Sequence, residues 1–366
     1  MPIDRLDQTA PLRIAMVVPP WYELPPAGYG GVEQVCAALV DALGARGHEV
    51  TLFGAGTGSG TSARFVGTMS RLQHDRLGQS LPELAHLARA DQMINPDVFD
   101  VVHDHTTIGP FLAPRRSVPT VATVHNRPTG ELGDILDDVD RSVGLVAISH
   151  AQRRLRPYLP WAATVHNGMA LDDVPYKTEA GAGPVLWLAR FSPDKGPDLA
   201  VRACRAAGLP LVLAGKCDEP EEQRYLAEVI EPMQGPDVTV LRNPDRETCF
   251  ELLLSARCLI MPIRWEEPFG MVIVEAMATG TPVVALDRGA VPELVRPGVT
   301  GLVCADPDDL PEALQRVAAL DPAASVAHVR NSFSAELMAE GYERVYRHWA
   351  ATVRPSENAL IPTGAW

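Results

Sequence analysis

The sequence contains very little lysine and no long apolar run. Of its 366 residues 32 are lysine or arginine, and the lysines are Lys177, Lys195 and Lys216 alone. Because no apolar run approaches the roughly 18–20 residues of a membrane-spanning helix, the sequence argues against an integral membrane protein. The 46 acidic residues leave a net charge of −14, which argues against a protein that binds nucleic acid phosphates.

The cysteines also lack a pattern that would give them a chemical role. None of the six forms a Cys-x-x-Cys pair, which argues against both a structural zinc site and a redox dithiol. We interpret them as small buried residues in a reducing compartment. The first eleven residues include acids and no apolar core, so we expect no signal peptide and a cytoplasmic location.

What the sequence does have is a regular alternation of strands and helices. An apolar run over 12–18 predicts a buried strand, and a loop rich in proline and glycine follows over 19–31. A helix with apolar residues at 32, 35, 39, 40 and 43 comes next, and then a strand over 48–54. This unit is typical of a doubly wound nucleotide-binding domain. Further strands are expected over 100–105, 120–126 and 145–150.

The alternation begins a second time after a polar, glycine-rich stretch over 171–184. Strands are expected over 185–190, 209–215, 238–243, 258–263 and 282–287, and helices over 246–256, 270–279 and 335–352. The length suits two cores of this kind. We therefore predict an α/β protein of two Rossmann-like domains, residues 1–170 and 171–334, facing each other across a central cleft.

The most informative segment is 265–280, which reads WEEPFGMVIVEAMATG. It begins as a tight loop and continues as a helix that places Glu275 among apolar residues, where an unpaired carboxylate is costly. One interpretation is a core glutamate satisfied by hydrogen bonds. The other is a helix N-terminus whose free N–H groups at 270–272 face an anionic ligand, with Glu275 and Glu267 accepting bonds from ligand hydroxyls.

The pattern Glu-Pro-Phe-Gly-x4-Glu, formed by Glu267 to Glu275, resembles the paired-glutamate signature of glycosyltransferase family 4. That family comprises retaining enzymes with the GT-B fold. Four other segments resemble family motifs in the same order and spacing, namely 29–53, 165–169, 188–201 and 280–303. The resemblance extends from about residue 12 to about residue 350.

The resemblance implies transfer of a sugar from a nucleotide-sugar donor with retention of the anomeric configuration. The C-terminal domain would bind the donor and the N-terminal domain the acceptor, expected to be small and polar or a carbohydrate. The helix over 335–352 would pack back on the N-terminal domain, with a hinge near 171–183. Many relatives carry a glycine where this chain has Arg242-Asn243, so UDP is the first expectation, GDP the second, and ADP stays open. The sequence indicates neither the sugar nor the oligomeric state.

The same resemblance assigns the expected site residues. Arg190 and Lys195 match the pair that binds the donor diphosphate, where two cations stabilise the leaving charge without a metal. Glu275 matches the ribose-binding glutamate, Glu267 the one that contacts the transferred sugar, and His125 the histidine beside the reacting sugar. His125, Glu267, Arg190 and Lys195 form the expected catalytic set. Donor binding is expected also from Gly30, Gly31, Lys216, Phe269, Gly270, Met271 and Val272, and acceptor binding from Trp21, Tyr29, His105 and Asn126.

No metal ion or other cofactor is expected. His103 and His105 would face the same side of a strand end, but the sequence offers them no convincing third ligand. Since neither glutamate suits the position of a nucleophile, we expect a front-face route without a covalent sugar–enzyme intermediate. Two alternatives stay open at this point: a sugar phosphorylase on the same fold, and a non-catalytic module that binds a ligand or partner.

Overall fold

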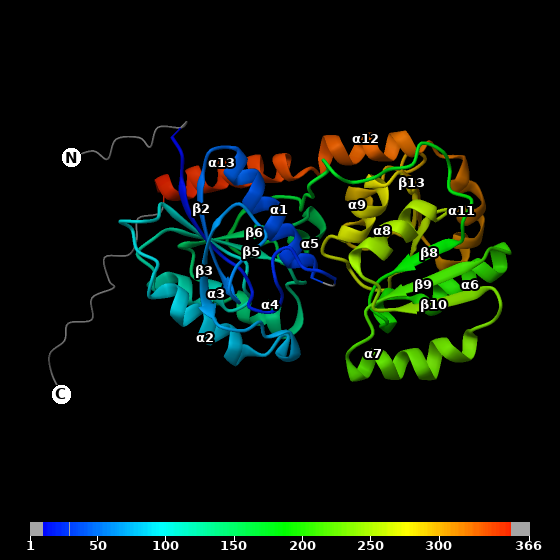
Figure 1. Cartoon of the computed structure of the whole chain (residues 1–366), viewed down its shortest axis with the longest axis horizontal. Coiled ribbons are helices and arrows are strands. Elements are labelled where there is room, and N and C mark those ends of the chain that lie inside the picture. The colour runs from blue at the N-terminus through cyan, green and yellow to red at the C-terminus, as the bar shows by residue number, and fades with distance from the viewer. Residues whose placement is uncertain (1–9, 29, 353–366) are drawn as a thin grey trace.

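The computed structural model describes residues 10–28 and 30–352, and the chain forms two α/β lobes (Figure 1). Within these residues the first lobe has a seven-stranded sheet in the order β3-β2-β1-β4-β5-β6-β7, and the second a six-stranded sheet in the order β10-β9-β8-β11-β12-β13. All neighbouring strands pair in parallel. The predicted pair of Rossmann-like domains is therefore confirmed.

The strands and helices have the following bounds. The first sheet comprises β1 (Arg13–Val17), β2 (Glu49–Ala55), β3 (Arg64–Met69), β4 (Val101–Asp104), β5 (Thr120–Val124), β6 (Val143–Ala147) and β7 (Trp161–Thr164). The second comprises β8 (Val185–Leu188), β9 (Leu211–Gly215), β10 (Val238–Arg242), β11 (Leu259–Met261), β12 (Val283–Leu286) and β13 (Gly301–Cys304). The α-helices are α1 (Gly31–Ala45), α2 (Ser80–Asp91), α3 (Gly109–Leu112), α4 (Gly130–Leu136), α5 (His150–Leu155), α6 (Pro197–Ala207), α7 (Pro220–Tyr225), α8 (Arg246–Ser255), α9 (Met271–Ala278), α10 (Val291–Leu294), α11 (Leu310–Arg316), α12 (Pro322–Ser332) and α13 (Ala335–Thr352).

The apolar runs of the sequence become the inner strands of the two sheets. The residues of β4, β5 and β6 are all buried, because helices cover both faces of a parallel sheet. Strands β7 and β13 were not predicted. Each is an outer strand of four residues whose side chains are partly exposed, so neither gives the continuous apolar run that marks an inner strand.

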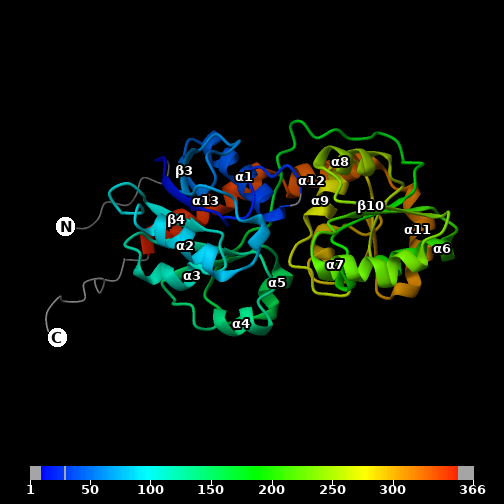
Figure 2. The ribbon, with the colours of Figure 1, turned by 60° about the horizontal axis from the view of Figure 1, so that its bottom comes forward.

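The last helix belongs to the first lobe. Figures 1 and 2 show α13 returning from the C-terminal lobe and lying beside α1. Tyr342 and Tyr346 of α13 are buried in the core that β1 and α1 build. The helix begins after Ser334, whose hydroxyl accepts a bond from the Leu337 N–H at 3.3 Å. The first lobe is thus built from both ends of the chain.

The chain crosses between the lobes twice, and the two crossings are bonded to each other. The Met169 N–H donates to the Phe333 carbonyl at 3.0 Å, and the Ala335 N–H donates to the Met169 carbonyl at 2.9 Å. A Cβ on Gly168 would lie 2.3 Å from the Ser334 carbonyl oxygen, so the close approach requires glycine. The two crossings are therefore bonded side by side at one place, which we call the hinge below.

Two further features bear on the sequence predictions. No helix among residues 10–28 and 30–352 has both the length and the apolar composition needed to cross a membrane. Five of the six cysteines are buried, as predicted, and Cys249 is half-buried beside the cavity described below.

Candidate active site

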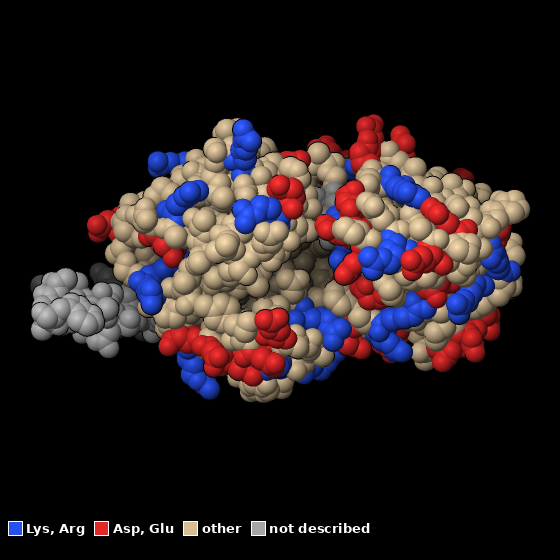
Figure 3. Space-filling model, turned by 90° about the horizontal axis from the view of Figure 1, so that it is seen from below, with Lys and Arg blue, Asp and Glu red and all other residues tan. Residues whose placement is uncertain are grey.

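A cavity of about 740 Å³ lies between the lobes. Seen from below, the surface is hollowed at this place (Figure 3). The loops that line it follow the C-terminal ends of strands in both sheets, where parallel α/β domains bind their ligands. The predicted residues that line it are Gly30, Gly31, His125, Asn126, Arg190, Lys195, Lys216, Glu267, Phe269, Gly270, Met271, Val272 and Glu275.

Two residues expected on the acceptor side are placed differently by the structure. Trp21 is buried and is not part of the cavity lining, and His105 is buried behind His125. The sequence places both beside the right loop or strand, but it does not show that their side chains turn into the core. The third, Tyr29, lies outside the described residues.

The loop after β8 places two cations in the cavity. The indole N–H of Trp187 donates to the Lys195 carbonyl at 3.0 Å and so fixes the backbone there. Gly196 has φ 65°, and a Cβ on it would lie 2.1 Å from the Pro262 carbonyl oxygen, so this turn requires glycine. The nearest carboxylate oxygen paired with Arg190 is on Asp194, at 3.9 Å, and the guanidinium is 37% exposed. Arg190 is therefore available to a ligand.

Lys195 is paired with a residue that the sequence assigns to another part of the donor. Its Nζ lies 2.5 Å from Oε2 of Glu267, and the Trp265 indole N–H donates to the same oxygen at 2.9 Å. The ammonium also lies 4.5 Å from the centre of the Trp265 ring. Because both bonds go to Oε2, Oε1 can accept a bond from a ligand hydroxyl. The pair can thus hold a diphosphate with one member and a sugar with the other.

Glu275 projects from α9, whose N-terminus follows Gly270. Burial raises the pKa of the Glu275 carboxyl, and the Arg246 guanidinium 3.5 Å away partly offsets that effect. The first N–H groups of α9 lack partners within the helix and open on the cavity at Met271 and Val272. An anionic group in the cavity would therefore meet these N–H groups.

His125 follows β5, is half-buried, and contacts a chain of buried rings behind it. His105 Nδ1 and His125 Nε2 are 2.9 Å apart, and the rings of His103 and His105 have centroids 3.9 Å apart. The Tyr346 hydroxyl bonds His103 Nδ1 at 2.6 Å, which connects α13 to the floor of the cavity. Burial lowers the pKa of His125 to about 4, so its imidazole is neutral at pH 7.

Two of these rings lie close to Cys36, a residue that the sequence did not group with the histidines. Ligand atoms of Cys36, His105 and His125 lie within 4.8 Å of one another, a spacing that a metal ion could bridge. Burial raises the pKa of the Cys36 thiol well above its usual range and lowers that of His105. A cation there would have to displace the bond between the histidines and the thiol proton, so this cluster is a poor metal site.

Sequence reasoning missed Gln152, which fixes the backbone on both sides of His125. Its side-chain amide donates to the Val124 carbonyl at 2.7 Å and to the Asn126 carbonyl at 2.9 Å. Gln152 is buried, and its own carbonyl accepts from the Ile148 N–H at 2.8 Å. The one signal in the sequence was a glutamine three residues after Ser149, the residue that caps the helix.

We expect Gln152→Ala to lower kcat by on the order of tenfold, with less than a twofold change in donor affinity. Removing the amide leaves two carbonyls beside His125 unpaired, so the imidazole loses its fixed position. Steady-state kinetics and donor titration measure the two quantities. Gln92→Ala, at an exposed position outside the cavity lining, is the control. A purely structural role would lower the melting temperature and leave kcat unchanged.

Two residues of the C-terminal lobe, Lys216 and Asn243, have contacts that the sequence did not predict. Lys216 lines the cavity, but its ammonium is bound by Glu222 at 3.1 Å and by Glu219 at 3.3 Å. Asn243 has φ 50°, a left-handed conformation that asparagine adopts more readily than most residues. Its N–H donates to the Gly215 carbonyl at 2.8 Å. Asn243 therefore forms a left-handed turn of the kind that glycine usually forms.

Family comparisons agree with this geometry. Residues 29–172 match the model described as Glycosyltransferase Family 4, and residues 179–327 match the model described as Glycosyl transferases group 1. The chain belongs to glycosyltransferase family 4. It is therefore a retaining enzyme that transfers a sugar from a nucleotide sugar, and the recognition made from the paired glutamates is confirmed. The phosphorylase and the non-catalytic module are not supported.

Individual family members and solved structures resemble the chain over most of its length. A D-inositol 3-phosphate glycosyltransferase of Acidothermus cellulolyticus is 27% identical, over 92% of this chain and 90% of that protein. AviGT4, a glycosyltransferase involved in avilamycin A biosynthesis, has a TM-score of 0.71 and 25% identity, covering 93% of this chain and 99% of its own. HepE of Anabaena, solved with UDP and glucose, shares the fold with a TM-score of 0.66 and 19% identity, covering 91% and 98%.

Proposed function

We propose that this family 4 enzyme transfers a sugar from a UDP-sugar to a small, uncharged, hydroxyl-rich acceptor such as a sugar or a cyclitol. The observation that carries the proposal is the division of charge across the cavity. Arg190, Lys195, Lys216 and Arg246 line it from the C-terminal lobe, whereas no lysine or arginine does so from the described part of the N-terminal lobe. This charge distribution supports binding of the donor diphosphate to the C-terminal lobe.

The acceptor side supports an uncharged substrate. Its described lining includes Gln34, His125, Asn126 and Asn167 as polar residues, all of them neutral at pH 7. Figure 3 shows few charged side chains on the N-terminal wall of the hollow. The Acidothermus relative is named for an inositol phosphate. Here we propose the hydroxylated ring without the phosphate, since the polar side chains that line this wall are uncharged and can bond hydroxyls.

UDP is proposed as the donor nucleotide, with GDP as the alternative. HepE, which has the same fold, was solved with UDP, and this supports UDP without deciding the base. The Arg190 guanidinium, the Lys195 ammonium and the α9 N-terminus would hold the diphosphate and stabilise the charge that grows on it as the sugar leaves. With three positive groups of the protein directed there, the reaction would not need a metal.

A front-face mechanism is proposed because no lining carboxylate among the described residues is free to act as a nucleophile. Asp218 accepts a bond from the Asn243 amide at 2.7 Å, and Asp245 accepts the Thr248 N–H at 2.8 Å. Glu267 and Glu275 have Lys195 and Arg246 as partners. The departing phosphate oxygen would then take the acceptor's proton directly, and no glycosyl–enzyme bond would form.

We expect UDP to raise the melting temperature more than GDP or ADP, because a ligand that binds the folded state stabilises it by mass action. UDP-sugars should then support transfer to methyl glycosides or myo-inositol, in EDTA and with retained configuration by NMR. The control acceptor is an inositol phosphate, which should be used less well. Strict dependence on added Mg²⁺, transfer from GDP-sugars alone, or a preference for the phosphorylated acceptor would each contradict part of the proposal.

A further inference from the structure

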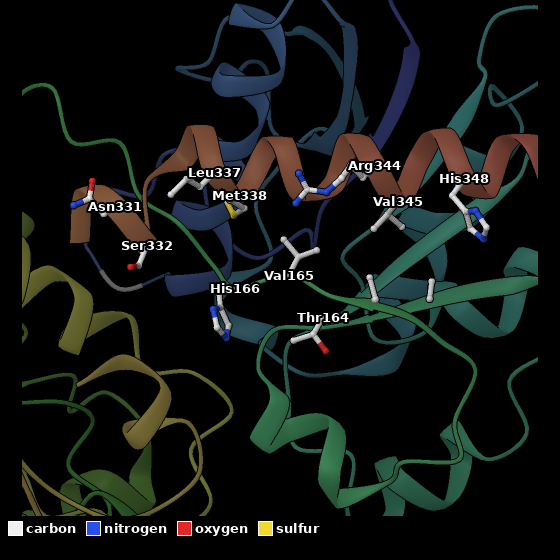
Figure 4. Close-up of a pocket in the computed structure, with 13 residues that line it drawn as sticks. Thr164, Val165, His166, Asn331, Ser332, Leu337, Met338, Arg344, Val345 and His348 are labelled. Carbon is white, nitrogen blue, oxygen red and sulfur yellow. The ribbon is translucent and has the colours of Figure 1, made fainter. Parts of the chain in front are cut away.

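Three metal-ligating side chains from both lobes meet beside the hinge, outside the cavity. They are His150 at the start of α5, His166 after β7, and Glu293 of α10 in the C-terminal lobe. One ligand atom from each lies within 4.8 Å of the other two. Figure 4 shows His166 at the end of a second, 470 Å³ cavity, with its ring turned away from α13 while Val165 points toward that helix.

The Glu293 carboxylate is held in a fixed position across the lobe boundary. Its Oε1 accepts the Ala151 N–H at 2.6 Å, and its Oε2 accepts the His150 N–H and His166 Nε2, both at 2.9 Å. A carboxylate oxygen has two lone pairs, so each oxygen can keep its main-chain bond and still bind a cation. Glu293 is thus pre-oriented as a ligand.

The distances suit a small divalent ion. Zinc binds imidazole nitrogen and carboxylate oxygen at about 2.0–2.2 Å, which in a tetrahedral site places the two atoms about 3.4 Å apart. His166 Nε2 and Glu293 Oε2 are 2.9 Å apart, so a small outward movement would admit the ion between them. The His150 side chain is exposed, and its bond to Glu293 comes from its main chain. Its ring packs edge to face against the His166 ring, with centroids 5.8 Å apart, so a rotation of the ring would bring its nitrogen to the ion.

We propose that His150, His166 and Glu293 bind one zinc ion, or a similar transition-metal ion, with water as the fourth ligand. Two histidines and one carboxylate with an open position are a ligand set that zinc uses in proteins. The ion fastens α5 of the first lobe and the segment after β7 to α10 of the second. It is separate from the transfer reaction, for which we propose no metal.

Binding of the ion would restrict the movement of the lobes. This expectation rests on the proposed function, in which the two lobes bind different substrates and movement of the lobes against each other brings the substrates together. Asn167, directly after His166, lines the active-site cavity. A metal ion at His166 therefore acts on the hinge and on the edge of the cavity together. We expect zinc to slow transfer while leaving donor binding to the C-terminal lobe unchanged.

The test is a zinc titration of metal-free full-length protein against a chelating dye, with Co²⁺ as a spectroscopic probe. Wild type should bind one equivalent, and His150→Ala and His166→Ala should each bind at least tenfold more weakly. The matched control is His74→Ala, at an exposed histidine far from the hinge in sequence, which should bind like wild type. Zinc should also raise the melting temperature of wild type but not that of His150→Ala.

Two outcomes would overturn the proposal. One is an absence of stoichiometric zinc binding to the folded wild type. The other is binding that survives in both histidine variants and disappears in Cys36→Ser, which would place the ion in the buried cluster of Cys36, His105 and His125. Both readouts are binding measurements, so they do not depend on the identity of donor or acceptor.

Discussion

Replacing Lys195 with methionine should lower kcat by on the order of a thousandfold, with the fold unchanged. The ammonium acts on charge that appears on the diphosphate as the sugar leaves, so its loss affects the transition state more than the bound donor. The substitution also leaves Glu267 without its cation, 2.5 Å away in the wild type, and an unpaired carboxylate repels the departing diphosphate. Arg190→Ala should have a smaller effect, since that side chain is more exposed.

The control for this effect is a substitution of another lysine of the chain, Lys177. Lys177 lies in the same lobe and donates to the Ala256 carbonyl at 2.6 Å, outside the cavity. Lys177→Met is therefore a matched loss of one ammonium and should keep nearly full turnover. The measurement is initial rate at saturating donor, with melting temperature as the check on folding. Turnover of Lys195→Met close to wild type would remove Lys195 from the catalytic set.

The second large effect is expected for His125→Ala, which should lower kcat by on the order of a hundredfold and change donor affinity little. In the proposed function the imidazole and its carbonyl would lie beside the reacting sugar, whereas the other lobe would hold the diphosphate and base. Because the pKa of His125 is about 4, the ring stays neutral from pH 8 down to about pH 5. Titration of His125 should therefore cause no fall in kcat near pH 6.5.

His74→Ala, an exposed substitution, is the control for His125→Ala. Donor titration and single-turnover rates separate binding from chemistry. If His125→Ala weakened donor binding a hundredfold and kept its kcat, the histidine would hold the donor and not the reacting sugar. A protonation of the wild-type site near pH 6.5 would show that His125 is more accessible to solvent than its burial indicates.

Much of the cavity wall in the C-terminal lobe was predictable, because the loops that follow parallel strands all lie at the same edge of the sheet. Arg190 follows β8, Lys216 follows β9, and Glu267 follows β11, so their convergence is a consequence of strand order. The alternation of apolar runs and helices predicts that the strands are parallel, but it does not predict their order in the sheet. Residues far apart in sequence were expected in one cavity because each of them matches a motif of glycosyltransferase family 4.

Pairings between loops were not predictable in the same way. The bond between Lys195 and Glu267 depends on the facing directions of two loops that the sequence does not relate. Gln152 matters for the site because its amide donates to two carbonyls at the end of β5. The spacing of residues within α5 does not predict these bonds. Glu293 reaches the other lobe, and its partners depend on how the lobes are set against each other.

The return of α13 to the first lobe has a consequence for how the protein is made. A ribosome releases the sheet of that lobe early, but the helix carrying Tyr342 and Tyr346 emerges after the whole C-terminal lobe has been synthesised. Until then the apolar face that α13 covers is open to water or to chaperones. The lobe that is translated first is thus the last to be completed, and a nascent chain stalled within the second lobe would display an unfinished core.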